Sequence, residues 1–203
     1  MSRLLAVLLT ACATPLAASP VPEHLFPKAH LYYPTQVGAE WVYRDGGTTY
    51  TYFVAKVEEK DGVSRVSVNL RHRDGKGSQH SHTMEVSKGG LREVSNFNRK
   101  VEPPTPVLKV PGAKGDKWEC PMALDGEKQC DYTLVAGGVE EVSVPAGKFN
   151  ALRIDQTSVG TDGKTIQTIA TWYAPGVGVV KMEYGGTREL VSFTPGKGAP
   201  AHK

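Results

Sequence analysis

The sequence predicts an all-β domain, with about ten antiparallel strands in one strongly curved sheet that forms an incomplete barrel or a sandwich. Turn signals recur along the whole chain: it has 22 Gly and 14 Pro among 203 residues, and Asp-Gly occurs at positions 45, 61, 74, 125 and 162. Between these turns lie short segments in which apolar and polar residues alternate. No segment shows a sustained helical period with caps, so helices are not the main elements.

The expected strands follow one another between turn signals. In residues 63–71, Val66, Val68 and Leu70 share one face of a strand, while polar residues share the other. Residues 93–101 are irregular and end at a proline-rich break. The remaining alternating segments are 48–58, 141–144, 151–155, 163–173, 177–184 and 187–193. Their spacing by tight turns is typical of antiparallel hairpins.

The chain is long enough for one domain with a real core. Residues 1–19 are expected to be a signal peptide and residues 20–32 a proline-rich tether. The β domain is expected to cover residues 33–195. Residues 196–203 show no periodicity and are expected to form a frayed tail.

The N-terminus indicates export. A positive start at Arg3 precedes an apolar run over residues 4–9, which is too short to cross a membrane. The segment Leu9-Thr10-Ala11-Cys12 resembles a bacterial lipobox, so Cys12 is expected to carry a lipid that anchors the protein to the membrane. Cleavage near residues 17–19 or after Ala13 remains an alternative. We therefore expect a protein of the bacterial periplasm or outer membrane.

Two further cysteines, Cys120 and Cys130, lie ten residues apart. An even pair of thiols in an exported chain is typical of a disulfide. A hairpin with the three-residue loop Leu124-Asp125-Gly126 would place the two cysteines directly opposite each other. Two free thiols or a metal site are the alternatives.

Several phrases of the sequence resemble a family of exported bacterial proteins of unknown function known as TapB-like. They are Tyr33-Pro34 followed by Val37-Gly38-Ala39-Glu40-Trp41-Val42-Tyr43, then Val144-Pro145-Ala146-Gly147-Lys148-Phe149, and finally Trp172-Tyr173-Ala174-Pro175-Gly176-Val177-Gly178. Together they span most of residues 33–193. The resemblance implies a β-rich architecture similar to the curved sheets of lipoprotein carriers and lipid-binding proteins. It carries no catalytic residues.

Three histidines, His72, His80 and His82, are the titratable residues that could form a metal site. His80 and His82 would share one face of a regular strand, and His72 could reach them across a hairpin. The favoured alternative is a solvated polar hairpin around Asp74-Gly75, so we expect no metal and no other cofactor.

The sequence does not indicate an enzyme. It lacks the Gly-x-Ser-x-Gly motif of many serine hydrolases, and the neighbouring pairs Glu58-Glu59 and Glu140-Glu141 would point to opposite faces of a strand. The formal charge of +3 is not concentrated in a basic block, so nucleic acid is not an expected partner.

Aromatic residues crowd the first quarter of the chain and return near its end. Core packing explains most of them. Alternatively, they line the concave face of the sheet as a groove for a hydrophobic small molecule or an envelope protein. The candidate lining residues are Trp41, Tyr43, Tyr50, Tyr52 and Trp172. We thus expect a non-catalytic envelope protein that binds through this face, with a structural or assembly module as the alternative.

Overall fold

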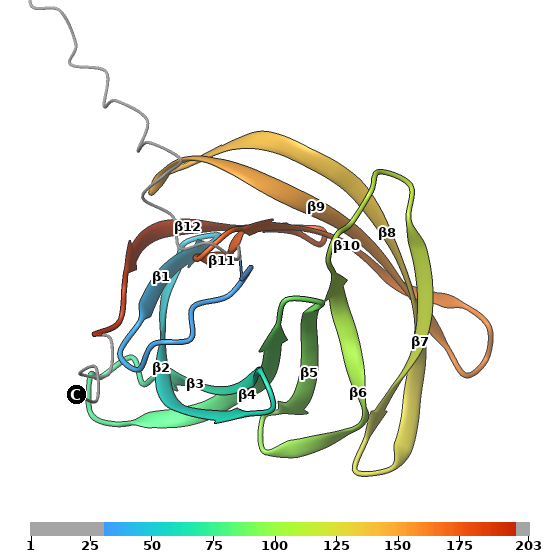
Figure 1. Ribbon diagram of the computed structural model, residues 1–203, viewed down its shortest axis with the longest axis horizontal. Coiled ribbons are helices and arrows are strands. Elements are labelled where there is room, and N and C mark those ends of the chain that lie inside the picture. Colours follow the sequence, from blue (N-terminus) through green and yellow to red (C-terminus); the bar gives the residue numbers. More distant parts are fainter. Residues whose placement is uncertain (1–30, 198–203) are drawn as a thin grey trace, which may run out of the picture.

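The computed structural model describes residues 31–197, which form a closed barrel of twelve antiparallel strands (Figure 1). Consecutive strands are neighbours around the barrel, and β1 pairs with β12 to close it. The strands are β1 Glu40–Asp45, β2 Thr48–Lys60, β3 Val63–Arg71, β4 Ser78–Ser87, β5 Gly90–Asn96, β6 Arg99–Lys109, β7 Lys117–Leu124, β8 Glu127–Val144, β9 Gly147–Gly160, β10 Thr165–Ala174, β11 Gly178–Glu183 and β12 Thr187–Thr194.

The all-β antiparallel class is confirmed, but the expectation of about ten strands in an incomplete sheet is wrong. Closure depends on β1, whose residues pair with β2 on one side and with β12 on the other. Trp41, for example, pairs with Tyr52 and with Phe193. Full closure leaves no exposed first or last strand edge.

The signal peptide 1–19, most of the tether 20–32, Cys12 and positions 198–203 of the tail lie outside the described residues. Leu31 and Tyr32, which the sequence places in the tether, pack against the core. The structured domain therefore includes both residues. Within residues 31–197, no helix has the length and apolarity that crossing a membrane requires.

The barrel is filled by apolar side chains from nearly every strand. Val66 and Val68 are fully buried, as their alternation predicts, whereas Leu70 is only partly buried. The largest buried side chains of this core are Trp41, Leu91, Leu108, Leu134, Leu152, Ile154 and Leu190. The concave inner face is thus occupied by the protein's own side chains.

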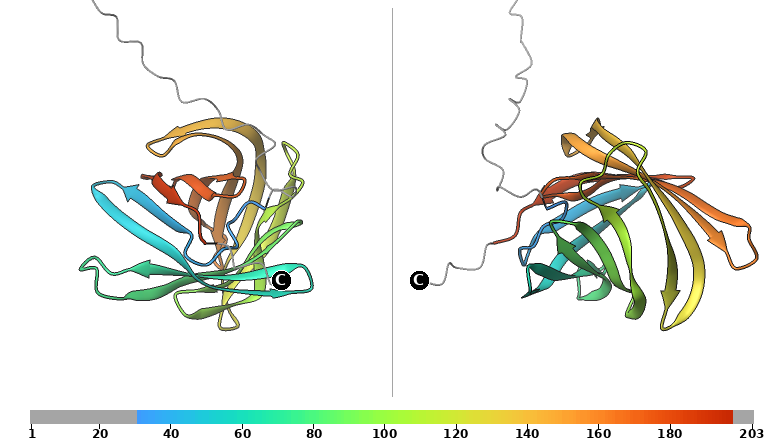
Figure 2. Two further views of the ribbon diagram at one scale, coloured as in Figure 1. Left: turned by 60° about the vertical axis from the view of Figure 1, so that its left-hand side comes forward. Right: turned by 45° about the vertical axis from the view of Figure 1, so that its right-hand side comes forward.

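The longest hairpin, β8–β9, bends away from the barrel wall. A register shift between Ala136 and Gly138 interrupts the pairing of β8 with β9, and Gly138 has a φ of 94°. Beyond this bend the hairpin arches over β11 and β12 (Figure 2). The amide of Ala146 at its turn donates to the carbonyl of Leu190, with an N–O distance of 3.0 Å. The hairpin therefore covers part of the outer face of the barrel.

The wall is weakest between β6 and β7, where Val101 and Leu124 are the one registered residue pair. The prolines of β6 lack the N–H groups that a ladder needs. Side chains bridge this seam instead: the Thr105 hydroxyl donates to the Pro121 carbonyl and the Trp118 indole donates to the Pro106 carbonyl. We call it the β6–β7 seam.

The two ends of the barrel differ in what reaches them. Because the strands run up and down in order, the turns β1–β2, β3–β4 and β11–β12 lie at one end, and the turns β2–β3, β4–β5 and β10–β11 lie at the other. Residues 31–39 enter at the second end, where the Gly176 amide donates to the Leu31 carbonyl at 2.7 Å. We call this the near end and the opposite one the far end.

Candidate functional site

Four of the five candidate lining aromatics share one face, as the sequence predicts. Trp41 pairs with Tyr52 and Tyr43 with Tyr50 across β1 and β2, and the rings of Tyr43 and Tyr52 meet edge to face at 5.8 Å. Trp41 and Tyr43 are buried. The Trp41 indole and the Tyr43 hydroxyl donate to the carbonyls of residues 177 and 179, which are 136 residues away in the sequence. These two residues hold the core together, and Tyr50 and Tyr52 lie closer to the far end.

Trp172 does not belong to this set. Tyr173 lies opposite Leu152 of β9 in the core, and neighbours on a strand point to opposite faces. Trp172 therefore faces outward, where its indole donates to Glu140 and is flanked by cationic side chains of residues 153 and 181. The expectation that Trp172 lines the concave face is wrong.

Tyr50 lies at the rim of the far end, beside a groove of ≈ 580 Å³. The guanidinium of Arg73 lies over the Tyr50 ring at 5.7 Å from its centre, and that of Arg188 lies at 5.8 Å. Stacking of this kind is favourable because the ring face is electron-rich. We call this pocket the rim groove; it is lined by Thr49, Tyr50, Thr51, Leu70, Arg71, His72, Arg73, Gly75 and Gln79.

The rim groove is cationic because its lining includes Arg71 and Arg73 and no acidic residue. The charge of Arg71 is balanced by Glu40, which lies outside the lining, with an N–O distance of 2.7 Å. The charge of Arg188 is balanced by Asp45, with an N–O distance of 3.0 Å. Hydrogen bonds from Tyr184 and Arg188 hold the pKa of Asp45 below its usual range, so this carboxylate stays charged. Arg73 makes no ion pair with a carboxylate of the described chain.

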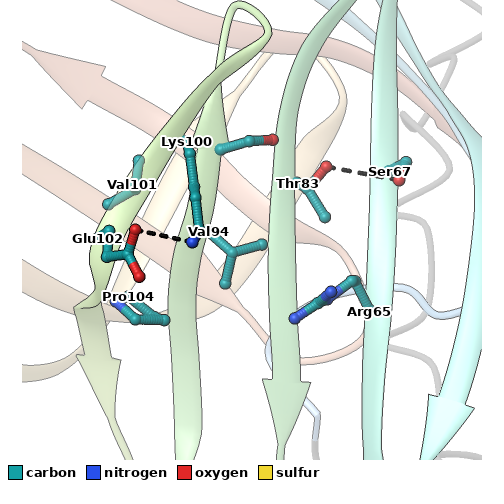
Figure 3. Close-up of a pocket in the computed structure, with 9 residues that line it drawn as sticks. Arg65, Ser67, Thr83, Val94, Lys100, Val101, Glu102 and Pro104 are labelled. Atoms are coloured by element: carbon teal, nitrogen blue, oxygen red, sulfur yellow. Dashed lines mark hydrogen bonds and ion pairs between the residues drawn. The ribbon is translucent and has the colours of Figure 1, made fainter. Parts of the chain in front are cut away.

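Two other grooves carry compensated charges. The first, of ≈ 340 Å³, lies over β3 to β6 and is called the outer groove (Figure 3). In Figure 3 the Thr83 hydroxyl faces Ser67 on the neighbouring strand, and Lys100 lies beside Glu102 at 2.7 Å. Arg65 in the same groove pairs with Glu85 at 2.9 Å. The second, of ≈ 400 Å³ at the near end, has lysines and acidic residues in equal number.

The histidines are not brought together. His72 is exposed at the β3–β4 turn, His80 contacts Ser95, and the imidazole of His82 contacts Tyr33. A register shift leaves Ser81 unpaired between His80 and His82, so the two rings no longer share one face. The disfavoured alternative, in which three imidazoles form one site, is therefore wrong, and the described residues contain no group of three metal-ligating side chains.

His82 lies inside the barrel between two hydroxyls. The Tyr33 hydroxyl is 2.8 Å from Nε2 and the Ser81 hydroxyl is 3.0 Å from Nδ1. Burial lowers the pKa of His82 to about 4, so the ring is neutral at neutral pH. A neutral imidazole carries one N–H, so the ring donates to one hydroxyl and accepts from the other. The segment before β1 is fixed to the barrel wall by this contact.

A partly buried acid that faces inward, Glu93, was missed by sequence reasoning. Its carboxylate accepts from the Asn96 amide at 2.8 Å. Burial raises the pKa of Tyr33, Tyr132 and Tyr173, and the charge of Glu93 raises it further. Burial raises the pKa of Glu93 itself. The sequence pattern of residues 93–101 is irregular, but Leu91 and Glu93 alternate onto one face, and this alternation is the signal for an inward position.

The predicted disulfide is absent, since Cys120 and Cys130 are both free thiols. The turn contains only Asp125 and Gly126, both with positive φ, and β7 has a register shift at residues 122–123, before the turn. Cys120 therefore lies opposite Tyr132 and Cys130 opposite Met122. Burial raises the pKa of the Cys120 thiol to about 11, which keeps it in its unreactive protonated form.

Comparison with known proteins finds the same fold among exported proteins. A family profile described as DUF3108-like matches residues 135–195. An exported protein of Bacteroides fragilis, described as having a YmcC-like fold, aligns over 81% of this chain and 99% of its own, with 17% identity and a TM-score of 0.54. A Parabacteroides distasonis protein, described as a lipoprotein, aligns over 83% and 100%, with 14% identity and a TM-score of 0.50. The chain shares their fold. No curated protein sequence matches.

Proposed function

We propose that the protein is a non-catalytic, lipid-anchored binding protein of the bacterial cell envelope, which contacts its ligand or partner through the rim groove. The main supporting observation is that the chain enters the barrel at the end opposite the rim groove. The chain enters at the near end beside Gly176, whereas Tyr50 and Arg73 lie at the far end. A lipid on Cys12 would hold the near end toward the membrane and leave the rim groove accessible.

Export and anchoring are supported by independent observations. The lipobox-like segment 9–12 lies upstream of the barrel, and the structures that share the fold are described as an exported protein and a lipoprotein. The resemblance to TapB-like proteins points to the same compartment. We assign the protein to the periplasm or outer membrane.

The inner face is a poor place for a hydrophobic ligand because it carries the core. Val54, Val66, Val68 and Leu91 are each 0% exposed there. A hydrophobic small molecule could enter only by displacing side chains that are packed at the density of a protein interior. We therefore place the binding contact at the rim.

The proposal includes no catalysis because the serine–histidine contacts lack a third member. His80 contacts Ser95 at 2.9 Å and His82 contacts Ser81 at 3.0 Å. A hydrolytic triad needs a carboxylate that orients the imidazole. In residues 31–197 neither ring makes a hydrogen bond with a carboxylate.

Anchoring is tested by metabolic labelling with an alkyne-bearing fatty acid in cells that express the full chain. We expect label on the wild type and none on Cys12→Ser, with the wild type in the membrane fraction. Labelling that is unaffected by the substitution would contradict anchoring at Cys12.

The rim contact is tested by placing a photo-crosslinking amino acid at Thr49, in the rim groove, or at Lys60, at the near end. We expect crosslinked adducts in cells from position 49 and few from position 60. Native mass spectrometry of the purified protein would reveal a small ligand. Adducts from position 60 alone would contradict the proposed orientation.

A second candidate is an assembly module, favoured by the β6–β7 seam. Backbone groups of β7 lack a continuous ladder partner on this side, so a strand of another envelope protein could add there. Replacing Val101 and Leu124 with cysteines would lock the seam, since the two residues are directly opposite each other across it. Loss of a stable complex in the locked form would support this candidate.

A further inference from the structure

We propose that the rim groove binds an anionic saccharide, a sugar that carries a carboxylate or phosphate group. The inference rests on the proposed function, which places the binding contact at the far rim, and it adds the chemical class of the ligand. It depends on one guanidinium, on the polar groups beside it and on the contrast with the other grooves.

Arg73 is an anion-binding group whose donors are free. Its guanidinium is held over Tyr50, and it makes no hydrogen bond or ion pair with another described residue. A guanidinium presents five N–H donors in a planar fork that matches carboxylate and phosphate oxygens. Stacking on the ring restricts the side chain before a ligand arrives, so less conformational entropy is lost on binding.

The remaining lining groups suit a ligand rich in hydroxyls. Thr49 and Thr51 contribute hydroxyls, Gln79 an amide and His72 an imidazole, so both donors and acceptors surround the cation. The volume of ≈ 580 Å³ lies within the usual range of small-molecule sites. An anion without hydroxyls would leave most of these groups to water.

The charge pattern distinguishes this groove from the other two. Arg65 and Lys100 in the outer groove are paired with carboxylates at 2.9 and 2.7 Å, and the near-end groove contains Glu59 and Asp61. An anion approaching either would meet carboxylates. The lining of the rim groove contains no carboxylate: Glu40 pairs with Arg71 from outside it, and Asp74, next to Arg73 in the chain, accepts from the Lys76 amide.

The test is calorimetric titration of the full-length protein with three probes: trigalacturonate, which has carboxylates, neutral maltotriose, and inorganic phosphate. We expect trigalacturonate to bind at least about tenfold more tightly than either of the others, because only it offers both charge and hydroxyls. Its affinity should fall as salt rises, since the site is exposed.

Arg73→Ala should weaken trigalacturonate binding about tenfold, the loss expected for one hydrogen-bonded charge. Arg73→Lys should restore only part of it, because lysine lacks the planar fork. Arg65→Ala is the matched control, an exposed arginine in the outer groove, and should change nothing. Circular dichroism of each variant verifies its fold.

Equal binding of maltotriose would overturn the requirement for charge, and equal binding of phosphate would overturn the saccharide. No binding of trigalacturonate, or binding that Arg65→Ala weakens as much as Arg73→Ala does, would overturn the assignment to this groove. None of these results changes the crosslinking pattern from position 49, so failure of this inference is distinguishable from failure of the proposed function.

Discussion

The contact between Tyr33 and His82 fixes the segment before β1 to the barrel wall, so its loss is expected to lower the stability of the protein. Tyr33→Phe removes the hydroxyl that lies 2.8 Å from the His82 Nε2 atom and keeps the ring. Tyr33 is 6% exposed and its ring lies 5.4 Å from that of Trp41, so the apolar packing is retained. The substitution therefore isolates one hydrogen bond inside the barrel.

The expected magnitude follows from burial. A hydrogen bond contributes about 1 kcal/mol net, and leaving a buried partner unsatisfied costs about 1–3 kcal/mol. Because water cannot readily replace the hydroxyl beside His82, we expect the free energy of unfolding to fall by about 2 kcal/mol. For a domain of this size that is a decrease in Tm of roughly 4–8 °C.

The assay is urea and thermal unfolding at neutral pH, where the phenol of Tyr33 is protonated because burial raises its pKa. Tyr32→Phe is the matched control, since Tyr32 is the neighbouring and less buried tyrosine and makes no hydrogen bond through its hydroxyl to another described residue. Equal losses in the two variants, or a loss below about 0.5 kcal/mol for Tyr33→Phe, would refute the reasoning.

Three further predictions concern the interior and the seam. Glu93→Gln should raise the free energy of urea unfolding at pH 8 and leave it unchanged near pH 4. Burial raises the pKa of Glu93, so the contribution of this residue to stability falls as pH rises through that pKa. An equal effect of Glu93→Gln on the free energy of unfolding at both pH values would contradict this. Trp118→Phe removes the indole donor to the Pro106 carbonyl and should destabilise the protein by about 1 kcal/mol, with faster amide exchange in β7. Unchanged exchange there would mean that the indole does not hold the seam. Both Cys120 and Cys130 should react with a thiol reagent after unfolding without reductant, and Cys120→Ser should leave Tm the same under oxidising and reducing conditions.

Local patterns in the sequence were sufficient for the fold class and for one face of the candidate site. Alternation placed Val66 and Val68 in the core, and it placed Tyr43 and Tyr50 on a shared face. Asp125-Gly126 formed a tight turn because both residues adopt positive φ. These outcomes depend only on near neighbours along the chain, so the residues themselves carry the information.

Those local patterns do not determine the register with which neighbouring strands pair. A single extra residue at Ser81 turned His80 and His82 to different faces, and a two-residue turn with a register shift moved Cys120 away from Cys130. Both errors came from assuming regular strands, since a bulge changes the face of every following side chain. The hydrogen bonds of the partner strand decide where a bulge forms.

The sequence by itself therefore determined an antiparallel β domain and a shared aromatic face, because turn chemistry and period-two alternation are local. Only the tertiary structure decided that β1 closes on β12, that Trp172 faces outward and that Arg73 stacks on Tyr50 without a carboxylate partner. Each of these depends on residues distant in the chain meeting in space, and that meeting is set by the packing of the whole barrel.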